Sequence, residues 1–262
     1  MIDTHCHLDA RAFDEDRDAV LARARAAGVT ALVVPGVAPG GWAAAARLAA
    51  EEPGVHVAFG IHPQLLPQVP AREDDAMLSD LEAALSRGGA VAVGECGLDG
   101  GSFGAASLER QAALLRAQLA LARRFGLPVI LHLLRAQHEL LALLREEAPL
   151  PAGGVLHSYS GGAEMVAPYA ALGLHFSFGG PITYDGARKP LAALRAVPAG
   201  RLLVETDAPD QTPRPHRGRC EPAFLAEVLR AAAAALGRPE EEVARETSAA
   251  ARRLFRLGPP CG

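Results

Sequence analysis

The first nine residues of the chain, MIDTHCHLD, place two histidines on alternate positions. If this segment is a β-strand, His5 and His7 lie on one face, because successive side chains of a strand point to opposite faces. Two imidazoles on one face are suited to binding a metal ion. The simpler interpretation is an N-terminal tag or a solvated turn, so the other histidines and carboxylates of the chain must decide between the two.

Four further residues of metal-ligand type occur at the ends of short apolar runs, namely Glu95, His132, His157 and Asp207. If the runs are strands of a barrel, their carboxyl ends carry these residues toward a common mouth. Four imidazoles and two carboxylates exceed the needs of one tetrahedral zinc ion, but they can hold two divalent ions if a carboxylate bridges. Two ions about 3.5 to 4 Å apart activate water for hydrolysis. We expect Glu95 to bridge, and Asp207 to bind one ion and accept the proton of the attacking water.

Eight apolar runs must position these residues. The first is the N-terminal segment, and the others span 31–36, 56–63, 90–95, 128–132, 154–158, 174–180 and 202–207. They are continuously apolar, as strands buried on both faces of a parallel sheet are. Between them, segments such as 14–27 and 107–125 carry apolar residues at helical spacing. This alternation predicts an α/β protein in which residues 1–262 form one (β/α)8 barrel domain, with a doubly wound open sheet as the alternative.

The composition limits the classes of function. The net charge is −4 at pH 7, which argues against broad electrostatic binding to nucleic acid or anionic lipid, so any nucleic-acid contact must be local. The sequence contains neither an apolar stretch long enough to span a bilayer nor the residue order of a signal peptide, so we expect no membrane contact and a cytoplasmic protein. The four cysteines are widely separated, which predicts reduced thiols.

The motifs IDTHCHLD, GIHP, GECGLD, PVILH, VLHSYSGG and ETDAPD resemble, in this order, those of the TatD family of metal-dependent hydrolases in the amidohydrolase-like superfamily. The resemblance spans essentially the whole chain. It implies a distorted TIM barrel, two divalent ions and a deoxyribonuclease, often a 3′ to 5′ exonuclease. It also implies that one ion is bound by His5, His7, Glu95 and Asp207, and the other by Glu95, His132 and His157. Such ligands admit Zn, Mg, Mn, Co or Ni.

The expected substrate contacts are His62 and Arg135. His62, in the motif GIHP, ends the third apolar run beside the same mouth, where it either contacts substrate or caps the turn at Pro63. The family usually has an arginine two positions after the histidine of the fifth strand. Here Arg135 stands one place later, after His132-Leu133-Leu134.

Two further features leave alternatives open. Asp99 either orients a ligand imidazole or belongs to a turn before two glycines. The polar run 209–221 predicts a long loop after the eighth strand, bordering the active face of the barrel. Its Arg214, Arg217 and Arg219 either bind phosphate through bidentate contacts or are solvated.

Three functions compete at this point. The leading hypothesis is a monomeric deoxyribonuclease whose substrate is DNA or a small phosphoester. The second is a hydrolase of small esters, lactones or amides, because related barrels use the same metal site on carbon. The third is a barrel that has lost catalysis and serves as a scaffold, which six filled ligand positions argue against.

Overall fold

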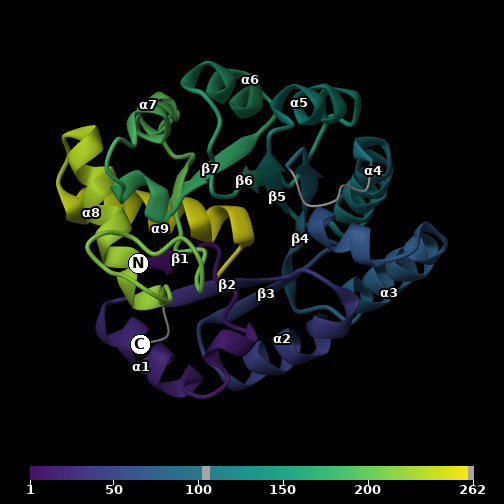
Figure 1. Cartoon of the computed structure of the whole chain (residues 1–262), viewed down its shortest axis with the longest axis horizontal. Helices are drawn as coiled ribbons and strands as arrows, with labels where there is room; N and C mark the ends of the chain where they lie inside the picture. The colour runs from purple at the N-terminus through teal and green to yellow at the C-terminus, as the bar shows by residue number, and fades with distance from the viewer. Residues whose placement is uncertain (102–106, 259–262) are drawn as a thin grey trace.

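The structure, a computed structural model, describes residues 1–101 and 107–258. In these residues eight parallel strands lie side by side in chain order, with helices around their outside (Figure 1). The strands are β1 (Ile2–Asp3), β2 (Ala31–Gly36), β3 (Val55–Phe59), β4 (Ala90–Asp99), β5 (Val129–Leu134), β6 (Gly154–Leu156), β7 (Leu174–Phe178) and β8 (Leu202–Val204). The helices are α1 (Arg17–Ala26), α2 (Pro39–Glu51), α3 (Asp74–Ser86), α4 (Leu108–Phe125), α5 (Gln137–Glu146), α6 (Val166–Ala171), α7 (Arg188–Ala196), α8 (Leu225–Leu236) and α9 (Glu240–Phe255). The predicted α/β barrel is confirmed.

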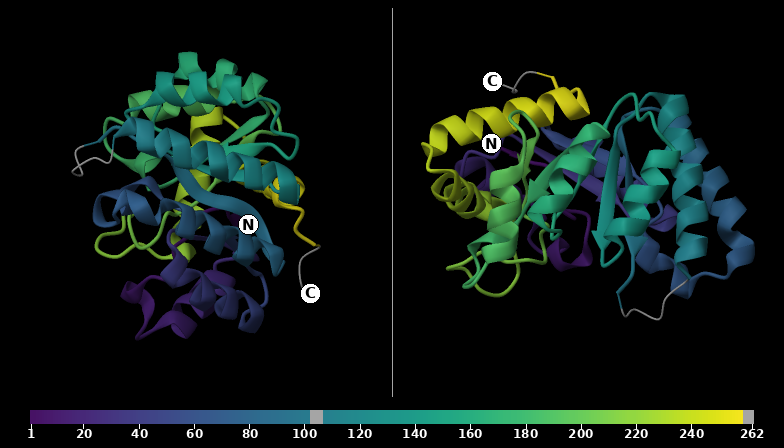
Figure 2. Two further views of the ribbon diagram at one scale, coloured as in Figure 1. Left: turned by 90° about the vertical axis from the view of Figure 1, so that its right-hand side faces the viewer. Right: turned by 90° about the horizontal axis from the view of Figure 1, so that it is seen from above.

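Both faces of the strands are buried, as the continuous apolar runs predict. Val33 and Ile130 belong to a core inside the barrel, whereas their neighbours along the strands pack outward against the helices. Leu254 and Phe255 of α9 join the inner core. Figure 2 shows α9 lying across one end of the barrel, opposite the loop that follows β8. One end of the barrel is therefore closed by apolar packing.

Hydrogen bonds between the segments after β1 and β8 close the barrel. Asp207 N donates to His5 O (2.9 Å). The buried Asp3 carboxylate accepts hydrogen bonds from Thr206 N (3.0 Å) and Thr206 Oγ1 (2.6 Å). Burial outweighs these bonds and raises the pKa of Asp3 to about 8. This seam holds the first and last strands in register and so fixes His5 beside Asp207.

Strand β4 is longer than predicted and continues past Glu95 to Asp99. Gly97 makes this possible, because its φ of 149° and its close approach to β5 exclude a side chain. A Cβ at this position would lie 2.0 Å from the backbone oxygen of His132. Glu95 and His132 therefore lie inside their strands. The apolar runs had predicted that both residues lie at the strand ends.

The predicted helix boundaries hold where capping residues are present. Ser107 caps α4, with its Oγ accepting a hydrogen bond from Arg110 N (3.3 Å), and Gly126 ends the helix with a left-handed φ of 64°. The segment predicted as a helix over 14–27 contains α1, which begins only at Arg17. Within residues 1–101 and 107–258, no helix has the length and apolar character needed to cross a membrane.

The cysteines agree with the expectation of unpaired thiols where the structure describes them. Cys6, Cys96 and Cys220 are free and buried. All three pack in the layer between the strands and the helices, and Cys6 and Cys96 point away from the ligand-type residues beside them in sequence. Cys261 lies outside the described residues.

Candidate metal centre

The two histidines that follow β1 meet at the carboxyl end of the barrel. Nε2 of His5 lies 3.2 Å from Nε2 of His7, while Cys6 between them packs outward. Their side chains share a face although β1 itself ends at Asp3. Two ring nitrogens at this distance need a shared proton or a cation, because two lone pairs repel each other. His5 is fully buried, so this segment is part of the packed barrel and not a tag.

Glu95 lies at the centre of the site and is 2% exposed. Its Oε2 lies 3.1 Å from His5 Nε2 and 3.6 Å from His7 Nε2. Burial alone would raise the pKa of this carboxyl. The surrounding imidazoles, His157 and His62 foremost, outweigh burial and hold the pKa of Glu95 well below its ordinary value. The Glu95 carboxyl group is therefore ionised and stabilises positive charge around it.

The other oxygen of Glu95 faces three further imidazoles. Oε1 lies 2.8 Å from His157 Nε2, 2.9 Å from His62 Nε2 and 3.0 Å from His132 Nδ1. His157 Nε2 and His132 Nδ1 are themselves 3.4 Å apart. The Glu95 carboxylate thus stands between two groups of imidazoles, one on each oxygen.

Asp207 joins the group on the Oε2 side. Its Oδ1 lies 3.7 Å from Nε2 of both His5 and His7, and its Oδ2 accepts a hydrogen bond from the side-chain amide of Gln211. Burial raises the pKa of Asp207, and it outweighs the opposite effect of the nearby histidines. Asp207 is therefore a fixed, desolvated carboxyl group at the edge of the site.

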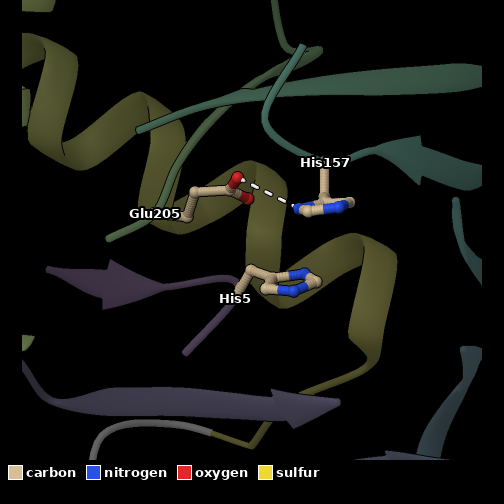
Figure 3. A group of neighbouring side chains, drawn as sticks. All are labelled: His5, His157 and Glu205. Carbon is tan, nitrogen blue, oxygen red and sulfur yellow. Dashed lines mark ion pairs between the residues drawn. The ribbon is translucent and has the colours of Figure 1, made fainter. Parts of the chain in front are cut away.

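Glu205 supports the site and was not predicted from the sequence. Its Oε1 accepts a hydrogen bond from Ser158 N (2.6 Å) and lies 3.5 Å from His157 Nδ1 (Figure 3). The His157 ring also stacks on the His5 ring, with centroids 3.9 Å apart. A carboxylate on one ring nitrogen orients the imidazole and leaves the other nitrogen for a ligand role. Glu205 is two residues before Asp207, so the alternation that pairs His5 with His7 could have identified it.

Asp99 fulfils both of its expected roles. Its Oδ2 lies 3.2 Å from His132 Nε2 and accepts a hydrogen bond from Gln64 Nε2 (2.7 Å). Its Oδ1 accepts one from Gly101 N (2.7 Å), which stabilises the following turn. His132 therefore directs its other nitrogen, Nδ1, at Glu95.

The donor atoms fit a divalent cation. Three overlapping groups hold their donor atoms within 4.8 Å of one another, and they are His5 with His7 and Glu95, His62 with Glu95 and His132, and His5 with His157 and Glu205. Imidazole nitrogen and carboxylate oxygen are common ligands of zinc, manganese, cobalt and nickel. In the described part of the chain, the buried Nδ1 of His5 has no hydrogen-bond partner. Facing lone pairs around a buried carboxylate are the arrangement that a bound cation would neutralise.

The site opens into a cavity of about 460 Å³ at the carboxyl end of the barrel. The lining residues are His7, Val37, His62, Gln64, Leu65, Gln68, Glu95, His132, His157, Asp207, Asp210 and Gln211. Of the residues that the structure describes, no arginine or lysine is among them. Histidines and any bound cation would therefore supply the positive charge in this cavity.

The two expected substrate contacts differ in position. His62 lines the cavity, and it also caps the following turn, because its Nδ1 accepts a hydrogen bond from Gln64 N (3.1 Å). Arg135 is exposed and is not a lining residue. Its backbone packs against Gly100, where an added Cβ would lie 2.6 Å from Arg135 O. The residues that line the cavity therefore include His62 but not Arg135.

Comparison with known proteins identifies relatives along the whole chain. A protein family described as TatD related DNase matches residues 2–256. The uncharacterized metal-dependent hydrolase YabD of Bacillus subtilis is 35% identical over 98% of this chain and 99% of its own. The 3′-5′ ssDNA/RNA exonuclease TatD of Erwinia billingiae is 35% identical over 98% of this chain and 99% of its own. The crystal structure of the TatD homolog YjjV from Escherichia coli superposes with a TM-score of 0.91 at 36% identity, covering 98% of both chains.

Proposed function

Because the chain belongs to the TatD family of metal-dependent hydrolases, we propose that it hydrolyses phosphodiester bonds of single-stranded DNA from the 3′ end. The Erwinia relative, whose name describes a 3′-5′ exonuclease, supports this substrate. The observation that carries the proposal is the position of Glu95, whose two oxygens face separate groups of imidazoles at the floor of an open cavity. A bridging carboxylate of this kind is typical of two-metal hydrolytic sites.

The proposed ligands divide between the two oxygens of Glu95. One ion would be held by His5, His7, Glu95 and Asp207, and the other by Glu95, His132 and His157. Bound there, two divalent ions would supply positive charge to the phosphoryl oxygens and lower the pKa of a water molecule. Asp99 and Glu205 would keep the rings of His132 and His157 in the required orientation.

Asp207 is the proposed acceptor of the proton from the attacking water. Gln211 holds one of its oxygens, and the carboxyl group borders the cavity. Burial raises its pKa, and a carboxylate with a raised pKa accepts a proton more readily. His62, which also borders the cavity, is the proposed contact to the substrate there, and Arg135 the proposed contact outside it.

The test is a cleavage assay with a 5′-labelled single-stranded oligonucleotide. Metal-free protein is supplied in turn with Zn2+, Mg2+, Mn2+, Co2+ or Ni2+. Hydrolysis from the 3′ end predicts a ladder of progressively shorter labelled products. His132→Ala should lower the rate at least about 100-fold, whereas His138→Ala, an exposed position on α5, should not change it. No shortening with any of the five metals would overturn the proposal.

The wall of the cavity favours a second candidate, a hydrolase of small esters or lactones. The described lining residues include neither arginine nor lysine, which a site for a polyanion commonly uses. The same two-metal site can act on carbon or on phosphorus. Lactones and a dinucleotide assayed side by side separate the two functions. A kcat/KM that is higher for a lactone than for the dinucleotide by a factor of ten or more (about 1.4 kcal/mol) would favour the second candidate.

A further inference from the structure

A second groove lies beside the metal centre, at the loop that follows β8. It has a volume of about 550 Å³, and Tyr184, Arg214 and Arg217 are among its lining residues. We call it the loop groove. The loop lies at the end of the barrel opposite α9 (Figure 2). Asp210 and Gln211 line the cavity of the metal centre, and the next residue, Thr212, lines the loop groove. The two depressions are therefore adjacent along the chain.

The backbone of the loop groove is held firmly. Arg214 N donates a hydrogen bond to Thr183 Oγ1 (2.8 Å), and Thr212 Oγ1 donates one to Gly218 O (2.5 Å). Gly180 packs so closely against Gln211 O that an added Cβ would collide with it. The His216 ring stacks on a neighbouring phenylalanine, with centroids 3.8 Å apart. The loop therefore presents its side chains from a fixed frame.

The exposed side chains of the loop groove include one aromatic ring, two arginines and the carboxylate of Asp185. Tyr184 is 38% exposed, although it is a large hydrophobic residue. Arg217 is exposed, and the Arg214 side chain is 53% exposed with only a loose ion pair, 3.9 Å long, to the highly exposed Asp185. Arg219, by contrast, is held by two carboxylates and lies over a phenylalanine ring. The structure thus separates the three arginines of the loop into one structural residue and two available ones.

We propose that the loop groove binds the part of a single-stranded nucleic acid that extends out of the metal-site cavity, an inference that rests on the proposed function. Tyr184 would stack on a base, and Arg214 and Arg217 would each contact a phosphate. Aromatic rings beside guanidinium groups are the usual means of binding single strands without sequence preference. The cavity itself is lined by no arginine or lysine of the described residues, whereas the loop groove has two arginines that would contact phosphates outside the cavity. A local site also agrees with the net charge of −4.

Binding is tested first, without catalysis. Fluorescence anisotropy measures the affinity of the full chain, in EDTA, for a labelled oligothymidine. Arg214→Ala/Arg217→Ala should weaken binding about tenfold and lower the salt dependence by roughly 1.4 in the log–log slope, as loss of two phosphate contacts predicts. Tyr184→Ala should weaken binding roughly fivefold or more, and Tyr184→Phe should retain it, because stacking needs only the ring. Arg47→Ala/Arg87→Ala, which removes the same charge from exposed positions of α2 and the end of α3, is the control.

Catalysis then distinguishes this proposal from the proposed function. The measured quantity is kcat/KM for the oligonucleotide divided by kcat/KM for bis(p-nitrophenyl) phosphate. This ratio should fall about tenfold in Arg214→Ala/Arg217→Ala, mainly through KM, and should not change in the control. If wild-type protein cleaves DNA but the groove variants change neither the affinity nor the ratio, the proposed binding groove is wrong and the proposed function is retained. If the groove variants lose affinity but wild-type protein cleaves no phosphodiester, the proposed function is wrong and the proposed binding groove is retained. Absence of binding by wild-type protein overturns the groove.

Discussion

The two ends of the barrel place histidines in opposite electrostatic surroundings. His157 follows β6 at the carboxyl end, and His175 lies in the adjacent strand β7, nearer the amino end. Burial lowers the pKa of both, but Glu95 and Glu205 outweigh it at His157 and raise its pKa well above the ordinary value. At His175, burial together with Arg201 lowers the pKa to about 4. Neighbouring strands therefore place the same side chain in opposite electrostatic surroundings, because carboxylates lie beside His157 and an arginine lies near His175.

The two ends also differ in what fills them. At the amino end, Leu254 and Phe255 of α9 complete an apolar core. At the carboxyl end, histidines and carboxylates converge beneath an open cavity. Stability and chemistry are thus separated along the axis of the barrel, as is usual for this fold. The predictions below test that separation, from the largest expected effect to the smallest.

Removing the negative charge of Glu95, at the centre of the carboxyl end of the barrel, should have the largest effect on activity. In Glu95→Gln, the carboxylate that both groups of imidazoles share is lost, so kcat/KM should fall by about 10³-fold or more, and bound metal should fall with it. Activity assays and elemental analysis of the purified protein measure the two effects. The control is Glu51→Gln, an exposed carboxylate on α2. Unchanged metal content in Glu95→Gln would show that Glu95 is not a ligand.

Removing a large side chain from the amino end should affect stability instead. Phe255→Ala leaves a cavity in the inner core, so the free energy of unfolding should fall by about 3 to 5 kcal/mol. Urea unfolding measures this loss, with Phe255→Leu as the milder control. The kcat of the fraction that remains folded should stay near that of the wild type. A large fall in that kcat would show that the two ends of the barrel are coupled.

Removing the charge of a carboxylate that orients a proposed ligand histidine should have an intermediate effect on metal affinity. Glu205→Gln removes the charge beside His157 Nδ1 but keeps a group that can accept the hydrogen bond from Ser158 N. Metal affinity should fall about 10- to 100-fold, as competition with a metal-sensitive dye would measure. Asp99→Asn, beside His132, should act in the same direction. Wild-type affinity in both variants would rule out a positioning role for these carboxylates.

The histidine at the amino end should contribute a small dependence of stability on pH. The pKa of His175 is about 4 in the folded chain, below its ordinary value of 6.5. The unfolded chain therefore binds a proton first as pH falls, so stability is full above about pH 6.5 and declines toward pH 4. His175→Gln should lose less stability over this range. The urea midpoints of both proteins at pH 7 and pH 5 test this, and equal losses would contradict it.

The sequence predicts those parts of the site that depend on alternation along a strand. His5 and His7 share a face as alternation predicts, although β1 ends at Asp3, and the apolar runs that precede Glu95, His132 and Asp207 lead toward the same end of the barrel. Glu205 was overlooked although it is related to Asp207 by the same alternation. Contacts between different strands, such as Glu205 with His157, depend on register and barrel closure, and neither can be deduced from one strand alone.

The limits of the strands were harder to predict than their presence. Hydropathy ends the fourth run at 95, but β4 continues because Gly97 lets it approach β5 without a side chain between them. The position of Arg135 follows from the same neighbourhood, since its backbone packs against Gly100 beyond the end of β4. The closure of the amino end by α9 depends on packing between distant parts of the chain, which spacing within one helix does not reveal.

The most direct test is a crystal structure of the protein soaked with Mn2+, with anomalous scattering used to locate the ions. Two peaks should flank the Glu95 carboxylate, one beside His5, His7 and Asp207 and the other beside His132 and His157. A single ion there would reduce the proposed site to a mononuclear one. No peak near Glu95, in crystals that bind manganese elsewhere, would contradict the metal centre and the hydrolytic mechanism built on it.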